Sequence, residues 1–277
     1  MTLSVRNNFF RGGIILAALS LIIIIAGAAF VFRAYPGTVE SASMRSHGVV
    51  QKLIEGFTEP SAYVPFWTML GAVAYSLISI SLIYFFFEKT QSPEILFFGL
   101  FVISLAFEFE RINIPLKQVF SFPPMYLITA ARILLFGRYF GLFSLFATGI
   151  FASGLDVQKQ QTVFFMLILA ALVIAFNVPI DSLVWDSSLK MLNGYGAMFA
   201  VVEGGILAVT VLTFMVSAFT RGSRHYIFIG LGAFMAFAGR NILLKSDTWI
   251  TPIPGILLLM GGTWLVCALL HREYLWL

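Results

Sequence analysis

Eight long apolar runs divide this sequence, and their length limits what the chain can fold into more than any other feature. The first, from residue 13 to residue 32, holds 20 residues without a charge. About 20 apolar residues in an α-helix span the roughly 30 Å hydrocarbon core of a bilayer. Backbone polar groups inside lipid must be satisfied within the structure, which favours helices. We place the runs at residues 13–32, 64–87, 95–114, 126–154, 162–178, 195–219, 226–244 and 254–270.

The composition agrees with this interpretation. The chain is 60% hydrophobic and 11% charged, whereas soluble domains are about 25% charged. The sequence therefore predicts an all-α fold, a polytopic membrane helix bundle of about eight transmembrane helices in four hairpins. We expect residues 1–277 to form a single transmembrane domain.

A faint internal repeat supports the arrangement in hairpins. Residues 98–124 and 228–254 each contain an aromatic-rich helix that ends in charges, followed by a Pro-rich turn. Transporters often carry internal repeats, and sensor bundles carry them as well. The repeat therefore leaves both classes open.

The first apolar run allows two interpretations. Arg6 and Arg11 precede it and small residues end it, which also resembles a signal peptide. The run is longer than the usual apolar region of about 7–15 residues in a signal peptide. We therefore predict an uncleaved first helix.

Lysines and arginines in the short turns favour an orientation with both termini inside. The inner turns would then hold Lys89, Lys159, Arg221 and Arg224. Residues 33–62 would form an outer loop. Within that loop residues 49–57 show the apolar spacing of an amphipathic helix, which would lie on the membrane surface or cover a ligand site as a lid.

Charged residues inside the apolar runs are the main functional signal. An ionised group in hydrocarbon costs from about 3 to more than 10 kcal/mol, so such residues pair, face the interior or mark a functional path. At a rise of about 1.5 Å per residue, charges from four helices fall in one layer of the outer leaflet, and Arg138 falls deeper. The predicted polar lining consists of Glu108, Arg111, Arg132, Arg138, Glu203 and Arg240.

Two explanations fit these charges. A buried ion-pair network can fix helix packing and register. Alternatively, the charges line a cavity open to the outer side. With Glu110 included, the arginines outnumber the glutamates by one. That excess would favour a small anionic or lipidic ligand, because arginine binds carboxylate and phosphate through its planar fork.

Catalysis finds little support in the sequence. His47, His225 and His271 share no membrane layer with the glutamates. Arginines near Glu108 and Glu203 would keep both carboxylates ionised, which is the wrong state for a general acid. The single cysteine excludes a Cys-based metal site. We therefore expect neither an enzyme nor a cofactor. We also expect no nucleic-acid partner, because the sequence contains no basic tract with interleaved aromatic residues.

The third and fourth predicted helices, at residues 95–114 and 126–154, resemble part of the multi-helix membrane input region at the N-terminus of some bacterial histidine kinases and cyclic-dinucleotide enzymes. The resemblance is carried by residues 105–108, 131–132, 138–141, the inner turn 156–159 and the inner turn 221–226. Only residues 271–277 follow the last predicted helix, so we expect no output domain. The resemblance implies a sensory bundle in a bacterial inner membrane that signals through a separate partner.

The sequence thus predicts a non-enzymatic sensory or ligand-binding module with membrane lipid around it. A small secondary transporter, or an accessory or structural subunit of a membrane complex, is the alternative. Against transport, the sequence shows no clear helix break at the midplane, where transporter sites are usually built.

Overall fold

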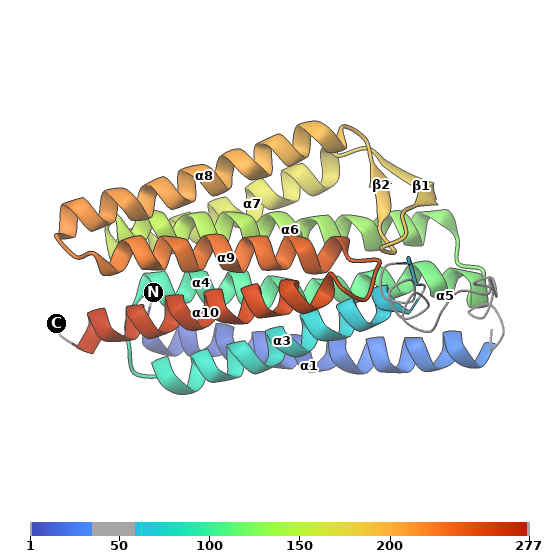
Figure 1. Cartoon of the computed structure of the whole chain (residues 1–277), viewed down its shortest axis with the longest axis horizontal. Coiled ribbons are helices and arrows are strands. Elements are labelled where there is room, and N and C mark those ends of the chain that lie inside the picture. Colours follow the sequence, from blue (N-terminus) through green and yellow to red (C-terminus); the bar gives the residue numbers. More distant parts are fainter. Residues whose placement is uncertain (1, 35–58, 62, 276–277) are drawn as a thin grey trace, which may run out of the picture.

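The computed structural model describes residues 2–34, 59–61 and 63–275. Helices dominate it, and they run side by side along the long axis of the molecule (Figure 1). The elements are α1 (Leu3–Ala34), α3 (Val64–Phe87), α4 (Pro93–Ser104), η1 (Leu105–Ile112), α5 (Asn113–Phe120), α6 (Pro124–Ala152), η2 (Val157–Lys159), α7 (Gln160–Asn177), β1 (Ile180–Trp185), β2 (Met191–Asn193), α8 (Gly196–Arg221), α9 (His225–Lys245) and α10 (Pro252–Leu275). The all-α prediction is confirmed apart from one short hairpin. The predicted amphipathic helix at residues 49–57 lies outside the described residues.

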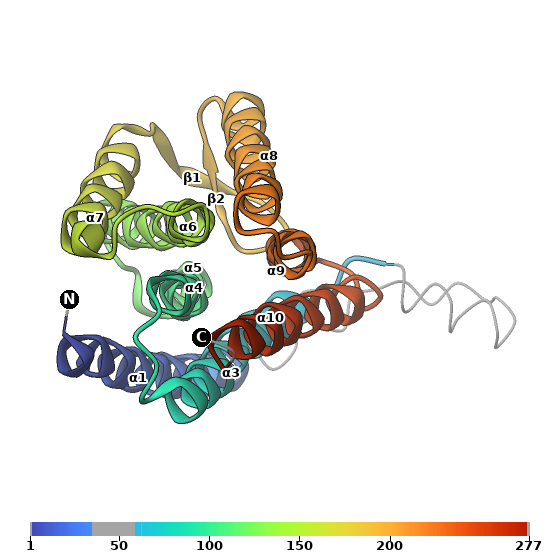
Figure 2. The same ribbon diagram turned by 90° about the vertical axis from the view of Figure 1, so that its left-hand side faces the viewer.

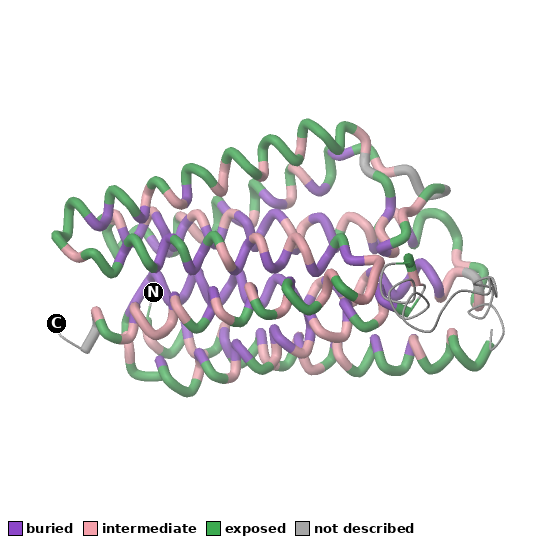
Figure 3. Tube along the Cα trace, viewed as in Figure 1, coloured by how far each residue is buried: buried purple, intermediate pink, exposed green. Residues whose placement is uncertain are grey.

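Seven helices of the described part are long and apolar enough to cross a membrane. Many of their apolar side chains face outward, as the exposed tube segments of α1, α7 and α8 show (Figure 3). In water such a surface would be unfavourable, whereas in lipid it costs nothing. The protein is therefore an integral membrane protein.

Local sequence explains where several helices begin. The Ser92 side chain accepts a hydrogen bond from the Ile95 backbone N–H, which caps α4, and Pro93 follows at the first helical position. Pro124 opens α6 and Pro252 opens α10 in the same way. Proline is favoured there because its missing N–H would have no partner anyway.

The third predicted helix, at residues 95–114, is not one continuous α-helix. It consists of α4, the eight-residue 3₁₀ segment η1 and α5. Pro115 lies inside α5, where it lacks the N–H that an α-helix would donate to the Arg111 carbonyl. The expectation of an unbroken span was therefore wrong. Long 3₁₀ stretches inside helices are rare and often mark a hinge or strain.

A second difference lies between α7 and α8, where we expected only a turn. Strands β1 and β2 pair antiparallel, with Ile180 opposite Asn193 and Trp185 opposite Met191. The Asp186 carboxylate orders the connecting turn by accepting hydrogen bonds from Ser188 and Lys190. The hairpin lies at the end of the bundle opposite both marked chain ends (Figure 1).

Helix α1 begins ten residues before the predicted start, and Arg6 accounts for the difference. The guanidinium is buried and donates hydrogen bonds to the carbonyls of Phe87, Glu88 and Thr90. These carbonyls lie at and just beyond the C-terminal end of α3, where the last carbonyls of a helix have no partner within the helix. Arg6 thus caps α3 from the neighbouring helix, and a cation suits the negative end of the helix dipole.

Arg6→Ala is expected to destabilise the protein by about 2–3 kcal/mol, because three carbonyls lose a charged donor. Arg11→Ala is the matched control on the same helix: the Arg11 side chain is exposed, and within the described part of the chain it donates only to the Tyr84 hydroxyl. Reversible unfolding in a mild detergent, followed by circular dichroism, measures both. Equal losses in the two variants would contradict the capping role.

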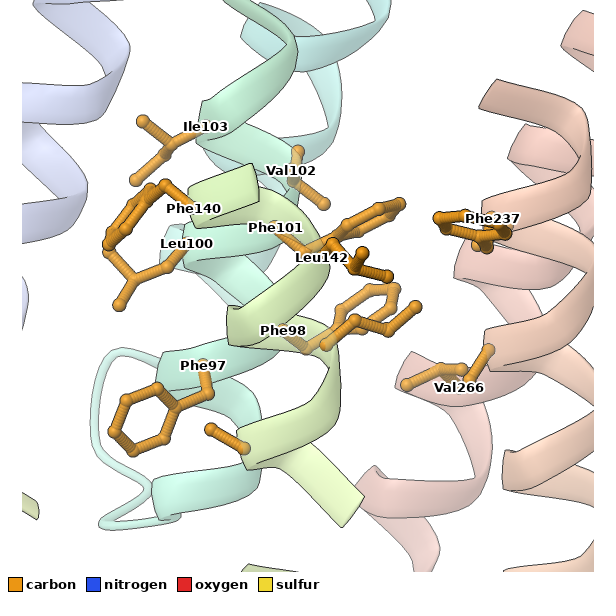
Figure 4. Packing of buried hydrophobic residues seen from close by; sticks show 14 of the residues in the cluster. Phe97, Phe98, Leu100, Phe101, Val102, Ile103, Phe140, Leu142, Phe237 and Val266 are labelled. Atoms are coloured by element: carbon orange, nitrogen blue, oxygen red, sulfur yellow. The ribbon is translucent and has the colours of Figure 1, made fainter. Parts of the chain in front are cut away.

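The core lies around α4, which is buried along its whole length. The end-on view shows α4 between α1, α3, α6 and α10 (Figure 2). Phe98 and Phe101 of α4 and Leu142 of α6 point toward Phe237 of α9 and Val266 of α10 (Figure 4). This layer of apolar side chains lies between the end of the bundle that carries both chain ends and the charged cluster described next.

Candidate functional site

The centre of the candidate site is an ion pair between η1 and α6. Arg138 donates from Nε to Glu108 Oε1 at 2.9 Å and from Nη2 to Glu108 Oε2 at 3.0 Å. Glu108 is 1% exposed. This two-pronged geometry is the strong form of a carboxylate–guanidinium pair. The sequence placed Arg138 deeper than the other charges, and in the structure its side chain reaches Glu108.

Arg111 completes the pair on the same face of η1. Its Nη1 lies 3.8 Å from Glu108 Oε2, and its Nη2 donates to the Ser188 carbonyl in the hairpin turn. A 3₁₀ helix has three residues per turn, which places residues three apart directly above one another. The 3₁₀ geometry thus aligns Arg111 with Glu108. Among the described residues, Arg111 Nε and Nη1 have no hydrogen-bond acceptor.

Arg240 of α9 lies on the other side of Arg138. It is 4% exposed, and its Nη2 donates to the Arg138 carbonyl at 2.9 Å. Its guanidinium lies 5.9 Å from the centre of the Phe101 ring. Nε and Nη1 are buried without a hydrogen-bond acceptor in the described structure. Two buried donors on one cation are costly unless something else accepts from them.

A polar cavity lies beside these arginines, between α6, α8, α9 and the hairpin. It has two parts, of about 50 and 150 Å³. Both parts are lined by Arg138, Lys190, Glu203 and Lys245, and Arg240 and Asp186 each line one of them. Four basic groups against two carboxylates give the lining a net positive charge. The volume holds several water molecules or a small anion.

Lys190 is a lining residue that sequence reasoning missed. It follows the hairpin turn, and burial, followed by repulsion from Arg138, lowers the pKa of its ammonium group. The backbone N–H of Lys190 donates to Asp186. Pro179 and the Asp186–Ser187–Ser188 turn were visible in the sequence, but the hairpin pairing that brings Lys190 over the cavity was not.

Three further glutamates and arginines that the sequence analysis named lie in different surroundings. Glu203 lines the cavity next to Tyr139. Arg132 is not brought to it, because its guanidinium lies over the Phe176 ring of α7 at 5.3 Å. Positions six apart on α6 point in directions about 120° apart, so Arg138 and Arg132 cannot share a partner. Glu110 accepts instead from Asn113 at 2.7 Å.

Comparison with known proteins adds little to this geometry. No family model matches the chain. A protein of Treponema pallidum (strain Nichols), described as uncharacterized, is 32% identical over 97 residues. The match covers 35% of this chain and 28% of that protein. The fold and the site together define the class as a helical integral membrane protein with a charged internal cavity.

Proposed function

We propose that the protein is a non-enzymatic ligand-binding module that takes a small anionic group into the cavity between α6, α8 and α9. In this proposal α4, η1 and α5 form an eighth span, so that the chain crosses a bacterial inner membrane eight times in four hairpins. Both termini lie inside, and the cavity opens toward the outer leaflet. Re-pairing of the charges by ligand would shift the helices, and a separate partner protein would receive the signal.

The buried Arg240 guanidinium carries this proposal. Its Nε and Nη1 have no acceptor among the described residues, and the side chain lines a cavity with a net positive charge. A carboxylate or phosphate oxygen would satisfy these donors, and the planar fork of arginine suits both groups. The Arg138 backbone carbonyl anchors Arg240, and Glu108 fixes the Arg138 side chain. The site is therefore organised before a ligand enters.

Isothermal titration of the purified protein with sodium phosphate and with sodium acetate tests the proposal, at constant ionic strength. We expect saturable binding of at least one anion, weakened roughly tenfold or more in Arg240→Gln, since a charged hydrogen bond contributes about 1.5–3 kcal/mol. Arg272→Gln is the control, because Arg272 lies on the last turn of α10 and is exposed. Absence of binding in the wild type, or equal affinity in Arg240→Gln, would overturn it.

One observation favours a second candidate, a small secondary transporter. The 3₁₀ segment η1 interrupts the third span beside the buried charges, and transporter sites are commonly built where helices are discontinuous. Uptake of the bound anion into proteoliposomes distinguishes the two functions. Uptake of the anion by the wild type supports transport, whereas binding without flux supports sensing.

A further inference from the structure

A second cavity lies on the opposite side of α4 and α6 from the charged site. It is an open cleft of about 410 Å³, lined by residues of α1, α4, η1, α6 and α7. This volume falls within the range of roughly 300–1,000 Å³ that is usual for small-molecule sites. Apart from the exposed Asn8, its lining is apolar, and it includes Phe9, Leu100, Phe107 and Phe164. Water in such a space would find almost no hydrogen-bond partners.

The mouth of this cleft faces hydrocarbon. Ile15 on α1 and Phe165 on α7, beside the cleft, are 60% and 62% exposed. They belong to helices that are long and apolar enough to span the membrane. In Figure 2 the helix α7 and the N-terminal part of α1 lie on the same outer side of the bundle. Helices α4 and α6 lie beside them, toward the centre of the bundle. The cleft is thus continuous with the lipid-facing surface.

A small polar pocket continues the cleft toward the end of the bundle that holds the chain termini. It measures about 30 Å³ and is lined by Thr2, Arg6, Gln91, Ser92, Leu96 and Gln160 among others. Leu96 lies one helical turn before Leu100, and Gln160 lies one turn before Phe164. The polar pocket and the apolar cleft therefore follow one another along the same helices. A polar end joined to a long apolar space has the shape of an amphiphile.

We infer that this composite site holds one phospholipid, with an acyl chain in the cleft and the phosphate end at the polar pocket. The Arg6 guanidinium supplies positive charge at that end, and Gln160 supplies an amide donor. The chain would lie against Phe107, whose neighbour Glu108 pairs with Arg138. The lipid would thus pack against the face of η1 that carries Phe107, opposite the charged site. This inference does not depend on the anion site proposed above.

Gly12 offers a way to fill the cleft without disturbing the helices. A Cβ built at Gly12 meets nothing within 4 Å, although Gly12 lines the cleft. Gly12→Leu therefore places a side chain in the space for the acyl chain. Gly204 is the matched control: it also lies on an apolar helix, and a Cβ there also meets nothing within 4 Å. Gly204 lies on α8, away from the cleft.

The experiment uses the full chain in phosphatidylcholine vesicles that contain a phosphatidylglycerol probe with a photoreactive diazirine on one acyl chain. Illumination followed by peptide mass spectrometry locates the label. A diazirine near the chain end should label residues around Leu100 and Phe107, and one near the ester should label residues 3–8 and 160–164. Gly12→Leu should reduce this labelling at least fivefold, and Gly204→Leu should leave it unchanged.

Labelling spread evenly over all lipid-facing helices, or equal labelling of Gly12→Leu and the wild type, would overturn the inference. Thermal unfolding shows whether each variant is folded. If Gly12→Leu does not fold, Val5→Trp fills the cleft from another position, since Val5 is 39% exposed and lines it. The same fivefold loss is then required of Val5→Trp.

Discussion

Glu108→Gln is expected to cause the largest loss of stability of any single charge substitution in this protein, about 3–5 kcal/mol. The carboxylate accepts both hydrogen bonds from Arg138 and lies 3.8 Å from Arg111. An amide removes the only negative charge between two buried cations. Breaking a buried ion pair by removing one partner leaves an uncompensated charge, which is the costly case. Reversible unfolding in mild detergent measures the effect.

Two companion variants make this prediction specific. Glu110→Gln changes the same residue type two positions along η1, where the carboxylate is only partly buried and accepts from Asn113. We expect Glu110→Gln to cost less than about 1 kcal/mol. The double variant Glu108→Gln with Arg138→Met should be more stable than Glu108→Gln alone, because the unpaired cation is gone. Equal losses in the two Gln variants would show that the pair does not organise the cluster.

Gly262→Ala is expected to destabilise the protein by about 3 kcal/mol, at the upper end of the range for overpacking. A Cβ at Gly262 would lie 2.5 Å from the Ala236 nitrogen and 2.5 Å from the Gly232 carbonyl oxygen, both backbone atoms of α9. Side chains can rotate away, but the backbone of a packed helix cannot. Helices α9 and α10 must therefore separate to admit one methyl group.

The neighbouring glycine provides the control. A Cβ at Gly261 meets only the flexible end of the Met235 side chain, at 3.6 Å. Gly261→Ala should be neutral or stabilising by up to about 1 kcal/mol, because alanine is the better helix former. Thermal denaturation of the two variants in one detergent compares them directly. Close backbone contact between α9 and α10 is excluded if Gly262→Ala unfolds no earlier than Gly261→Ala.

Several features could be predicted from the sequence because they depend on local composition and spacing. Apolar runs set the positions of the spanning helices, since lipid admits no other backbone arrangement at that length. The three-residue spacing of Glu108 and Arg111 is enough to place them on one face of a helix. The six-residue separation of Arg132 and Arg138 is enough to point them apart, and the structure places them so. The small residues Gly137 and Gly141 favour close helix contact, and they lie against η1 and α4.

Other features depend on residues that are distant in the chain. Thr90 and Arg6 are 84 positions apart, and Arg240 and Arg138 are 102 positions apart. No local pattern gives these distances, because they follow from how whole helices are packed. The sequence therefore determined that this is a helical membrane protein with charges inside its spans. Only the tertiary structure decided that Arg138 pairs with Glu108, that Lys190 reaches the cavity, and that two buried Arg240 nitrogens have no acceptor among the described residues. The interaction between two charges in a low-dielectric interior changes strongly over a few ångströms. The packing of the helices against one another sets these distances.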